Sequence, residues 1–335
     1  MNPAHRLLLL IPLVLLGTAG PSREATRSAG RGVAGARLRV LGTMQDGGLP
    51  HAGCSCARCE GEVNGTLPDR HVACLALLTP RDVRMGVDLV DCTPDVREQL
   101  RLLRDVRFDY PGGVNRAPID GVLLTHAHMG HYLGLAHLGY EAMHTHGVRA
   151  FASERMAGFL EENQPWASLI ERGEIVVTEI RPGEAFEPGG RDGGSEGSGV
   201  AVTPIVVPHR DELSDTLAFR FKGPRATVLY MPDCDPWGRW QERALEILDS
   251  ADVVIIDGTF FDGDELPGRD LSKIGHPLVI DTLALLGDRV ARGELRVILT
   301  HMNHTNPLIE PDSEARARVL DAGFEIAIEG MEIPL

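Results

Sequence analysis

The stretch Thr125-His126-Ala127-His128-Met129-Gly130-His131 places three histidines within six residues. It follows the mostly apolar run 119–124, which begins after a proline and is typical of a short buried strand. The histidines should therefore lie on a loop at the carboxyl end of a strand, where side chains can converge. Neutral imidazole is a common zinc ligand, and catalytic zinc sites combine several protein ligands with an open water position. The stretch predicts a metal site, with a solvated polar loop as the alternative.

Three further residues stand in the same kind of position. His209, Asp233 and His301 are each the first or second polar residue after an apolar run that predicts a strand. Loops at one edge of layered sheets commonly carry catalytic groups. A single histidine after a strand is most simply structural. The histidine stretch and these three residues are four such positions in order, and together they favour a metal centre.

Composition limits the classes of partner. The chain has 335 residues, of which 43% are hydrophobic and 24% charged, values typical of a globular protein with a sizeable core. Its formal net charge is −15 and no run rich in Lys and Arg appears, which disfavours a nucleic-acid partner. We expect a small-molecule substrate and no nucleic acid.

The amino terminus has the pattern of a secretory signal peptide. A weakly basic start at His5 and Arg6 is followed by the apolar run 7–16 and by small residues at 17–19. We expect a signal peptide over 1–19, a flexible linker over 20–36 and one domain over 37–335. The protein would then be exported, to the periplasm or outside the cell, with no stable membrane insertion after signal removal. An uncleaved membrane anchor is the alternative.

From Leu38 onward, strands and helices alternate. The predicted strands are 38–41, 73–78, 85–91, 121–124, 149–151, 174–178, 200–207, 217–221, 227–230, 253–257 and 296–300. The predicted helices are 94–106, 132–140, 154–163, 239–248, 277–287 and 312–322. The segment 182–199 is rich in glycine and predicts a surface loop between strands. This order predicts an α/β fold with two sheets and helices outside them.

The histidine motif and the ordered residues after it resemble the metallo-β-lactamase superfamily. The resemblance covers roughly residue 38 to the carboxyl terminus and implies a four-layer αββα sandwich with metals between the edges of two sheets. It further implies a first metal held by three histidines, a second held by two, and an aspartate that bridges both. These ligands would be His126, His128 and His209, then His131 and His301, and finally Asp233.

One position departs from the superfamily motif, which normally reads His-x-His-x-Asp-His. Gly130 stands where that aspartate usually ligates the second metal. We expect the second site to lose affinity, with Asp211 or Asp215 as candidates for a compensating carboxylate. A Gly130→Asp variant should then gain affinity for the second metal. Activity through one metal remains open, because a single zinc can bring bound water to a pKa near ~7.

The segment 41–50 and the cysteines after it resemble the PqqB-like branch of the superfamily, and they are also similar to its phosphoribosyl cyclic phosphodiesterases. The segments 257–261 and 301–307 add to the first likeness. The resemblance implies a structural zinc on Cys54, Cys56 and Cys59. Three thiolates within six residues can surround one tetrahedral zinc that takes a further ligand from elsewhere.

The remaining ligand and the redox state of these cysteines have alternatives. His276 is a candidate either for the fourth ligand or for a proton donor at the histidine site, as in the related tRNA 3′-end nucleases. An exported chain could instead pair its six cysteines in disulfides.

We expect metal-assisted hydrolysis of an ester, phosphodiester or similar bond. Asp233 would orient the attacking water and accept its proton, and His276 or His304 would assist the leaving group. The cofactors would be one structural zinc and one or two catalytic zinc ions. Two alternatives stand beside this: a PqqB-like oxidative enzyme of quinone cofactor biosynthesis with iron at the histidine site, and a non-catalytic binding or carrier protein on the same scaffold.

Overall fold

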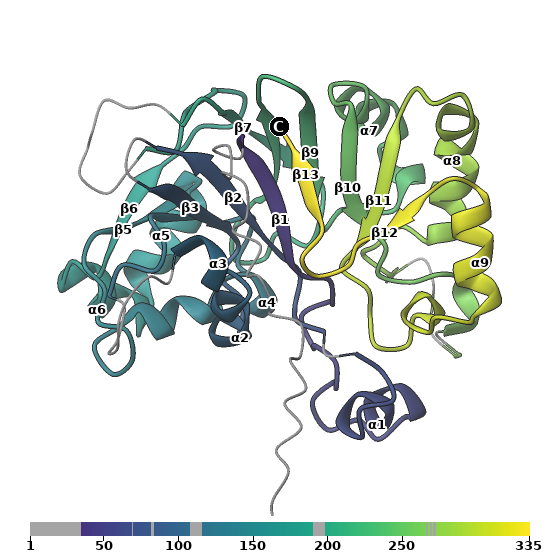
Figure 1. Ribbon diagram of the computed structural model, residues 1–335, viewed down its shortest axis with the longest axis horizontal. Helices are drawn as coiled ribbons and strands as arrows, with labels where there is room; N and C mark the ends of the chain where they lie inside the picture. Colours follow the sequence, from purple (N-terminus) through teal and green to yellow (C-terminus); the bar gives the residue numbers. More distant parts are fainter. Residues whose placement is uncertain are drawn as a thin grey trace, which may run out of the picture. The chain divides into compact units, whose positions relative to one another are not determined.

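Two mixed β-sheets lie at the centre of the fold (Figure 1). The first sheet has the order β13 (Glu332–Pro334), β1 (Arg37–Gly42), β2 (Cys74–Pro80), β3 (Met85–Val90), β4 (Gly121–Leu123), β5 (Val148–Ala152), β6 (Ile175–Glu179). The second has the order β12 (Glu325–Ile326), β11 (Arg296–Thr300), β10 (Val253–Asp257), β9 (Thr227–Met231), β8 (Thr216–Lys222), β7 (Ala201–Val207).

The structure is a computed structural model that describes residues 35–68, 70–81, 84–107, 116–189, 198–265, 267–268, 270 and 273–335. The predicted signal peptide and the linker up to residue 34 lie outside these ranges and stay predictions. Residues 35–335 form one unit. Within the described ranges, no helix combines the length and the apolar character needed to cross a membrane.

The layers follow from the period-2 pattern of the strands. On β2, Leu75 and Leu77 point into a core shared by the two sheets, whereas Ala76 and Leu78 point into a second core on the outer face. On β9, Tyr230 belongs to the shared core and its neighbours to a third core on the far side. Because both faces of these strands are buried, they read as nearly continuous apolar runs.

Helices cover the two outer faces of the sheets. Buried side chains of α2 (Val96–Arg101), α5 (Glu154–Glu162) and α6 (Trp166–Glu171) pack on the first sheet. Those of α7 (Gln241–Leu248), α8 (Val279–Ala291) and α9 (Glu314–Asp321) pack on the second, and Figure 1 shows α8 and α9 beside β11 and β12. The predicted four-layer αββα sandwich is confirmed.

Strand directions bring several loops to one edge. Strands β3 to β6 are parallel, as are β9 to β12. Strand β1 runs with β3, and β7 with β9, because each is two antiparallel steps away. The carboxyl ends of β1, β3, β4, β7, β9, β10 and β11 therefore open toward one edge of the sandwich, and the predicted site residues follow four of these strands.

Several helix predictions were wrong in detail. The predicted helix 94–106 is divided into α2 and α3 (Arg104–Arg107), and at the break the Arg39 guanidinium donates to the carbonyl of Leu102 at 3.0 Å. The predicted helix 132–140 is instead the short helix α4 (Met129–Tyr132) followed by the 3-10 helix Leu133–Leu138. There the Gly134 N–H donates to the Cys92 carbonyl rather than to a helical partner. The sequence prediction also omitted α1 (Ala57–Val63), α6, β12 and β13.

Candidate metal centre

His126, His128 and His209 converge at the carboxyl ends of β4 and β7. One ligand nitrogen from each lies within 4.8 Å of the others, and His126 Nε2 is 2.8 Å from His128 Nδ1. The His209 Nδ1–H donates to the carbonyl of Gly275 at 3.0 Å. A carbonyl oxygen only accepts, so this bond fixes the proton on Nδ1 and leaves a lone pair on Nε2.

A second group consists of Asp46 and His301, on the loops after β1 and β11, and of His131, on α4 after β4. Asp46 Oδ1 lies 3.2 Å from His131 Nε2 and 3.7 Å from His301 Nε2. His301 has a φ of 61°, in the left-handed region that a residue with a side chain adopts at a cost of roughly 1–2 kcal/mol. Such strain is common at functional sites, where the surrounding structure enforces it.

Asp233, after β9, lies between the two groups. Its Oδ2 is 3.0 Å from His131 Nε2 and 3.2 Å from His301 Nε2, whereas its Oδ1 is 3.6 Å from His209 Nε2. Oδ1 of this buried carboxylate therefore faces His209 of the first group, whereas Oδ2 faces the second group and also lies 3.9 Å from His126 Nε2. The arrangement is that of a bridging ligand.

Asp91 orients two of the rings from the end of β3. Its carboxylate accepts hydrogen bonds from the Thr125 hydroxyl at 3.0 Å and from His131 Nδ1 at 2.7 Å. Because the single Thr125 proton goes to Asp91, its oxygen accepts from His126 Nδ1, which is 2.9 Å away. Both histidines therefore carry their proton on Nδ1 and present Nε2 to the centre.

A parallel arrangement occurs at the end of β10. The Thr259 hydroxyl donates to Asp257 at 2.7 Å and its oxygen lies 2.9 Å from His301 Nδ1. Asp257 Oδ2 also accepts from His276 Nδ1 at 2.8 Å. The His276 ring lies 5.1 Å from that of His209 and 5.7 Å from that of His301, between centroids. His276 therefore lies at the histidine centre, and its role there stays a prediction.

The centre holds buried polar atoms that a cation would satisfy. Five of them make no hydrogen bond within the described ranges: Asp46 Oδ1, His131 Nε2, His209 Nε2, Asp233 Oδ2 and His301 Nε2. Buried polar atoms without partners are rare because each costs about 1–3 kcal/mol. Their convergence is what a metal site requires.

The charges of these groups fit the same conclusion. Burial lowers the pKa of His126 well below its ordinary value and that of His209 to about 4, so both are neutral ligands at neutral pH. Burial opposes ionisation of Asp233, but His301 and His131 hold its pKa well below the usual range. Neutral His126 and His209 with the ionised carboxylate of Asp233 suit divalent zinc or iron. Burial opposes protonation of His131, but the Asp91 carboxylate raises its pKa well above the ordinary value, so a metal ion at this ring competes with a proton. The residues present fit a metal centre.

A cavity of about 550 Å³ lies beside the centre and is lined by His276 and Thr259. Basic side chains of Arg210 and Lys273 line it as well. His304, a predicted proton donor, lies on the wall of the cavity, with its ring centroid 4.3 Å from that of His51. The centre is therefore open to a small molecule on one side.

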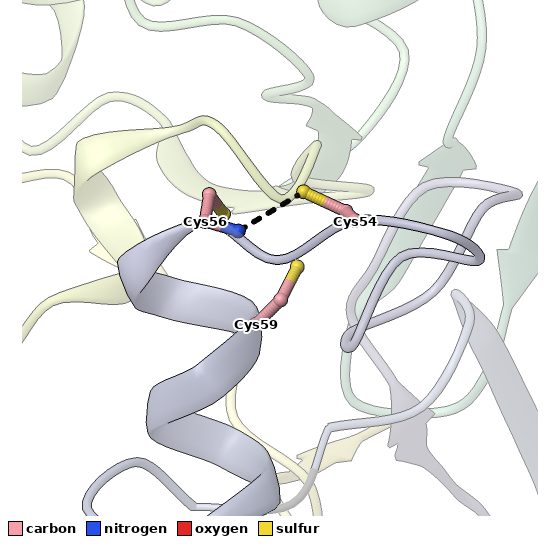
Figure 2. Close-up of side chains that lie close together, drawn as sticks. All are labelled: Cys54, Cys56 and Cys59. Atoms are coloured by element: carbon pink, nitrogen blue, oxygen red, sulfur yellow. Dashed lines mark hydrogen bonds between the residues drawn. The ribbon is translucent and has the colours of Figure 1, made fainter.

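The three clustered cysteines form a separate group where α1 begins (Figure 2). Their sulfur atoms lie within 4.8 Å of one another, and the Cys56 N–H donates to Cys54 Sγ at 3.4 Å. Burial opposes ionisation of Cys56, but the backbone N–H of Cys59 lowers its pKa. All six cysteines, each within the described ranges, are free thiols, so the disulfide alternative is wrong in this structure.

The comparison with protein families decides the relationship. A family model described as "Beta-lactamase superfamily domain" matches residues 89–302. The chain belongs to this superfamily. The predicted family is therefore confirmed.

Similarity to the PqqB-like branch is also supported. Coenzyme PQQ synthesis protein B of Cupriavidus necator is 29% identical over 325 residues, which cover 89% of this chain and 99% of the relative. Its namesake in Klebsiella pneumoniae (strain 342) is 26% identical, over 89% of this chain and 98% of the relative. The crystal structure of Zn²⁺-bound PqqB from Methylobacterium extorquens aligns with a TM-score of 0.72 at 22% identity, covering 89% of this chain and all of that one. A diphosphatase from the PhnP family aligns with a TM-score of 0.59 at 22% identity, covering 89% and 96%.

Neither carboxylate predicted to compensate for Gly130 in this superfamily member lies in the centre. Asp211 pairs with Arg155 at 3.6 Å, and Asp215 accepts a hydrogen bond from Ser153. That prediction was wrong, because both side chains are engaged with the segment that begins α5. Asp46, from a different part of the chain, stands beside Gly130 instead.

Sequence reasoning missed Asp46, Asp91 and Asp257. Two of them, Asp91 and Asp257, stand at the ends of predicted strands, so the rule that identified the histidines would have identified them had it been applied to all carboxylates. Asp46 lies within the segment 41–50, which resembles the PqqB-like branch, but nothing in its spacing indicates a contact with the histidine loop.

Proposed function

We propose that the chain is a metal-dependent hydrolase that cleaves a small ester, phosphodiester or similar bond. The observation that carries the proposal is the pair of buried ligand groups bridged by Asp233 and open to a cavity. A catalytic rather than structural metal site requires such an open side.

Three histidines would hold one ion and two would hold the other, with a shared carboxylate: His126, His128 and His209, then His131 and His301, and Asp233 between them. When bound, ions of this kind lower the pKa of a coordinated water to near ~7 and polarise a substrate oxygen. The Asp91 and Asp257 carboxylates keep the rings in the tautomer that this binding needs.

In this proposal, His276 would transfer a proton to the leaving group. Its Nδ1–H donates to Asp257, so Nε2 is the atom that can exchange a proton with a molecule in the cavity. Burial disfavours the imidazolium form, but the Asp257 carboxylate outweighs it and raises the pKa of His276. The raised pKa favours the imidazolium form, which is the form that a general acid needs.

We infer an anionic substrate, because the two basic residues of the cavity lining outnumber its carboxylate, Glu265. Arg210 and Lys273 are basic residues of its lining, and an arginine guanidinium matches phosphate oxygens well. The structural neighbour described as a diphosphatase supports the same substrate class. Among the bonds considered, we favour a phosphodiester of a small molecule, since the net charge of −15 disfavours polynucleotides.

The test is a turnover assay with zinc, manganese and ferrous ions on phosphodiester, phosphomonoester and carboxylic ester chromogenic substrates. We expect phosphodiester turnover that depends on added metal and is lost in the His126→Ala/His128→Ala variant. The Asp211→Asn variant is the control, because Asp211 pairs with Arg155 outside the centre. Equal turnover by the double variant and the native chain would refute the proposal.

A second candidate rests on the curated relatives named coenzyme PQQ synthesis protein B, which this chain matches over nearly their full length. In that case the same ligands would hold iron for an oxidative step in quinone cofactor biosynthesis. Oxygen consumption by the iron-loaded protein, without hydrolysis by the zinc-loaded form, would favour it.

A further inference from the structure

Position 130 has no space for a side chain, which accounts for the glycine found there. A Cβ built on it would lie 2.3 Å from Asp46 Oδ1 and 2.8 Å from Asp46 Cα, closer than such atoms approach. Its φ is not among the positive values found in the described ranges, so backbone conformation does not account for the residue. The volume that a side chain at 130 would need is filled by the Asp46 carboxyl group.

Asp46 aims its carboxylate at the second ligand group. Its Oδ1 lies 3.2 Å from His131 Nε2 and makes no hydrogen bond within the described part of the chain. The side chain is only 14% exposed, so this oxygen has little access to solvent. A buried carboxylate oxygen is costly unless it is paired with a cation.

The backbone that carries Asp46 is held against the loop of His301. The Gln45 N–H donates to the Met302 carbonyl at 2.9 Å, and the Met302 N–H donates to the Thr43 carbonyl at 2.8 Å. The Gly48 N–H then closes a turn on the Gln45 carbonyl at 2.8 Å, with Gly48 at a φ of 68°. Asp46 is thus positioned by main-chain bonds before any ligand binds.

We propose that Asp46 replaces the aspartate missing at position 130 as the anionic ligand of the second metal. Position 130 is then glycine because the Asp46 carboxyl group occupies the space that a side chain there would need; we call this replacement the exchange. The carboxylate reaches the same point from the loop after β1 instead of from α4. The proposal rests on the metal centre of the proposed function. It reverses the expectation from the sequence that the second site is weakened.

The exchange is tested by swapping the two residues and measuring zinc affinity by competition with a chromophoric chelator, with cobalt absorption spectra as a second readout. Asp46→Asn should weaken binding of one of the two ions at the histidine centre by at least about tenfold, whereas Asp211→Asn removes the same charge from an exposed ion pair outside the centre and should not. Gly130→Asp alone should also weaken that ion, because the new side chain displaces Asp46. The Asp46→Gly/Gly130→Asp variant should recover most of the affinity.

Two results would overturn the exchange. The first is a zinc affinity of the Asp46→Asn variant equal to that of the native chain. The second is a zinc affinity of the Asp46→Gly/Gly130→Asp variant no higher than that of Asp46→Gly. If His131→Ala weakens an ion while Asp46→Asn does not, only this inference fails. If His126→Ala/His128→Ala and His131→Ala remove no metal, the proposed function fails with it.

Discussion

Replacing Asp91 with asparagine should weaken metal binding although Asp91 itself lies behind the ligands. The carboxylate accepts from the Thr125 N–H at 2.9 Å, the Thr125 hydroxyl at 3.0 Å and His131 Nδ1 at 2.7 Å. An amide offers one acceptor oxygen and an NH₂ donor group, so it cannot accept from all three. The amide group is then expected to donate to His131 Nδ1, which shifts the ring proton to Nε2, the atom that faces Asp233.

The magnitude follows from the lost charged hydrogen bond. Such bonds contribute roughly 1.5–3 kcal/mol, and about 1.4 kcal/mol corresponds to a tenfold change in affinity. The Asp91→Asn variant should therefore bind the ion at His131 about 10- to 100-fold more weakly. This is the range found for other residues that orient metal ligands.

Chelator competition measures the affinity, and nitrogen NMR of the histidine rings reports the tautomer of His131. Asp120→Asn is the matched control, because Asp120 is equally buried and accepts from Arg84 at 2.9 Å and from the Val87 N–H at 3.0 Å, just before β4. It should lower stability and leave metal affinity unchanged. Native affinity in Asp91→Asn, or an equal loss in Asp120→Asn, would refute the reasoning.

Three other predictions concern separate parts of the molecule. Cys59→Ser should release one zinc per chain and lower the thermal midpoint, with metal at the histidine centre retained; loss of all metal would contradict two independent sites. Burial opposes protonation of His71, but its hydrogen bond with Glu329 raises the His71 pKa. The stabilisation that this pair contributes is therefore complete below the unfolded pKa of about 6.5 and is lost as pH rises through the folded pKa. Urea unfolding should therefore show a larger deficit for Glu329→Gln at pH ~5.5 than at pH ~8.5, and an equal deficit at both would contradict it. Arg210→Ala should raise KM at least about tenfold for a phosphodiester and less for a neutral ester. An equal rise in KM for both substrates would exclude recognition of the substrate's negative charge by Arg210.

The sequence was sufficient to predict the layers and to bring most of the candidate ligands to one sheet edge. Strands such as β9 and β10 are apolar on both faces, and that continuous pattern marks a buried sheet whatever its neighbours. His209, Asp233 and His301 follow such strands directly, so their common location depends only on strand direction. These signals depend on neighbouring residues alone, so they can be recognised in the sequence without the structure.

The remainder depends on contacts between distant segments. Strand β13 exists through its pairing with β1, and α2 ends where Arg39 reaches Leu102. The role of Gly130 is of the same kind, because the group that excludes its side chain is Asp46, from the loop after β1, which is far from position 130 in the sequence. A motif position that looks like a lost ligand is, in three dimensions, a neighbour of a carboxylate.

The central claim is that the histidines at this sheet edge hold metal. Elemental analysis of metal per chain, on protein purified without added metal, tests it most directly when the native chain is compared with His126→Ala/His128→Ala. We predict about three metals in the native chain, one on the cysteines and two at the histidines, with at least one lost from the variant while the cysteine-bound zinc remains. Equal metal content in the two proteins would contradict the account.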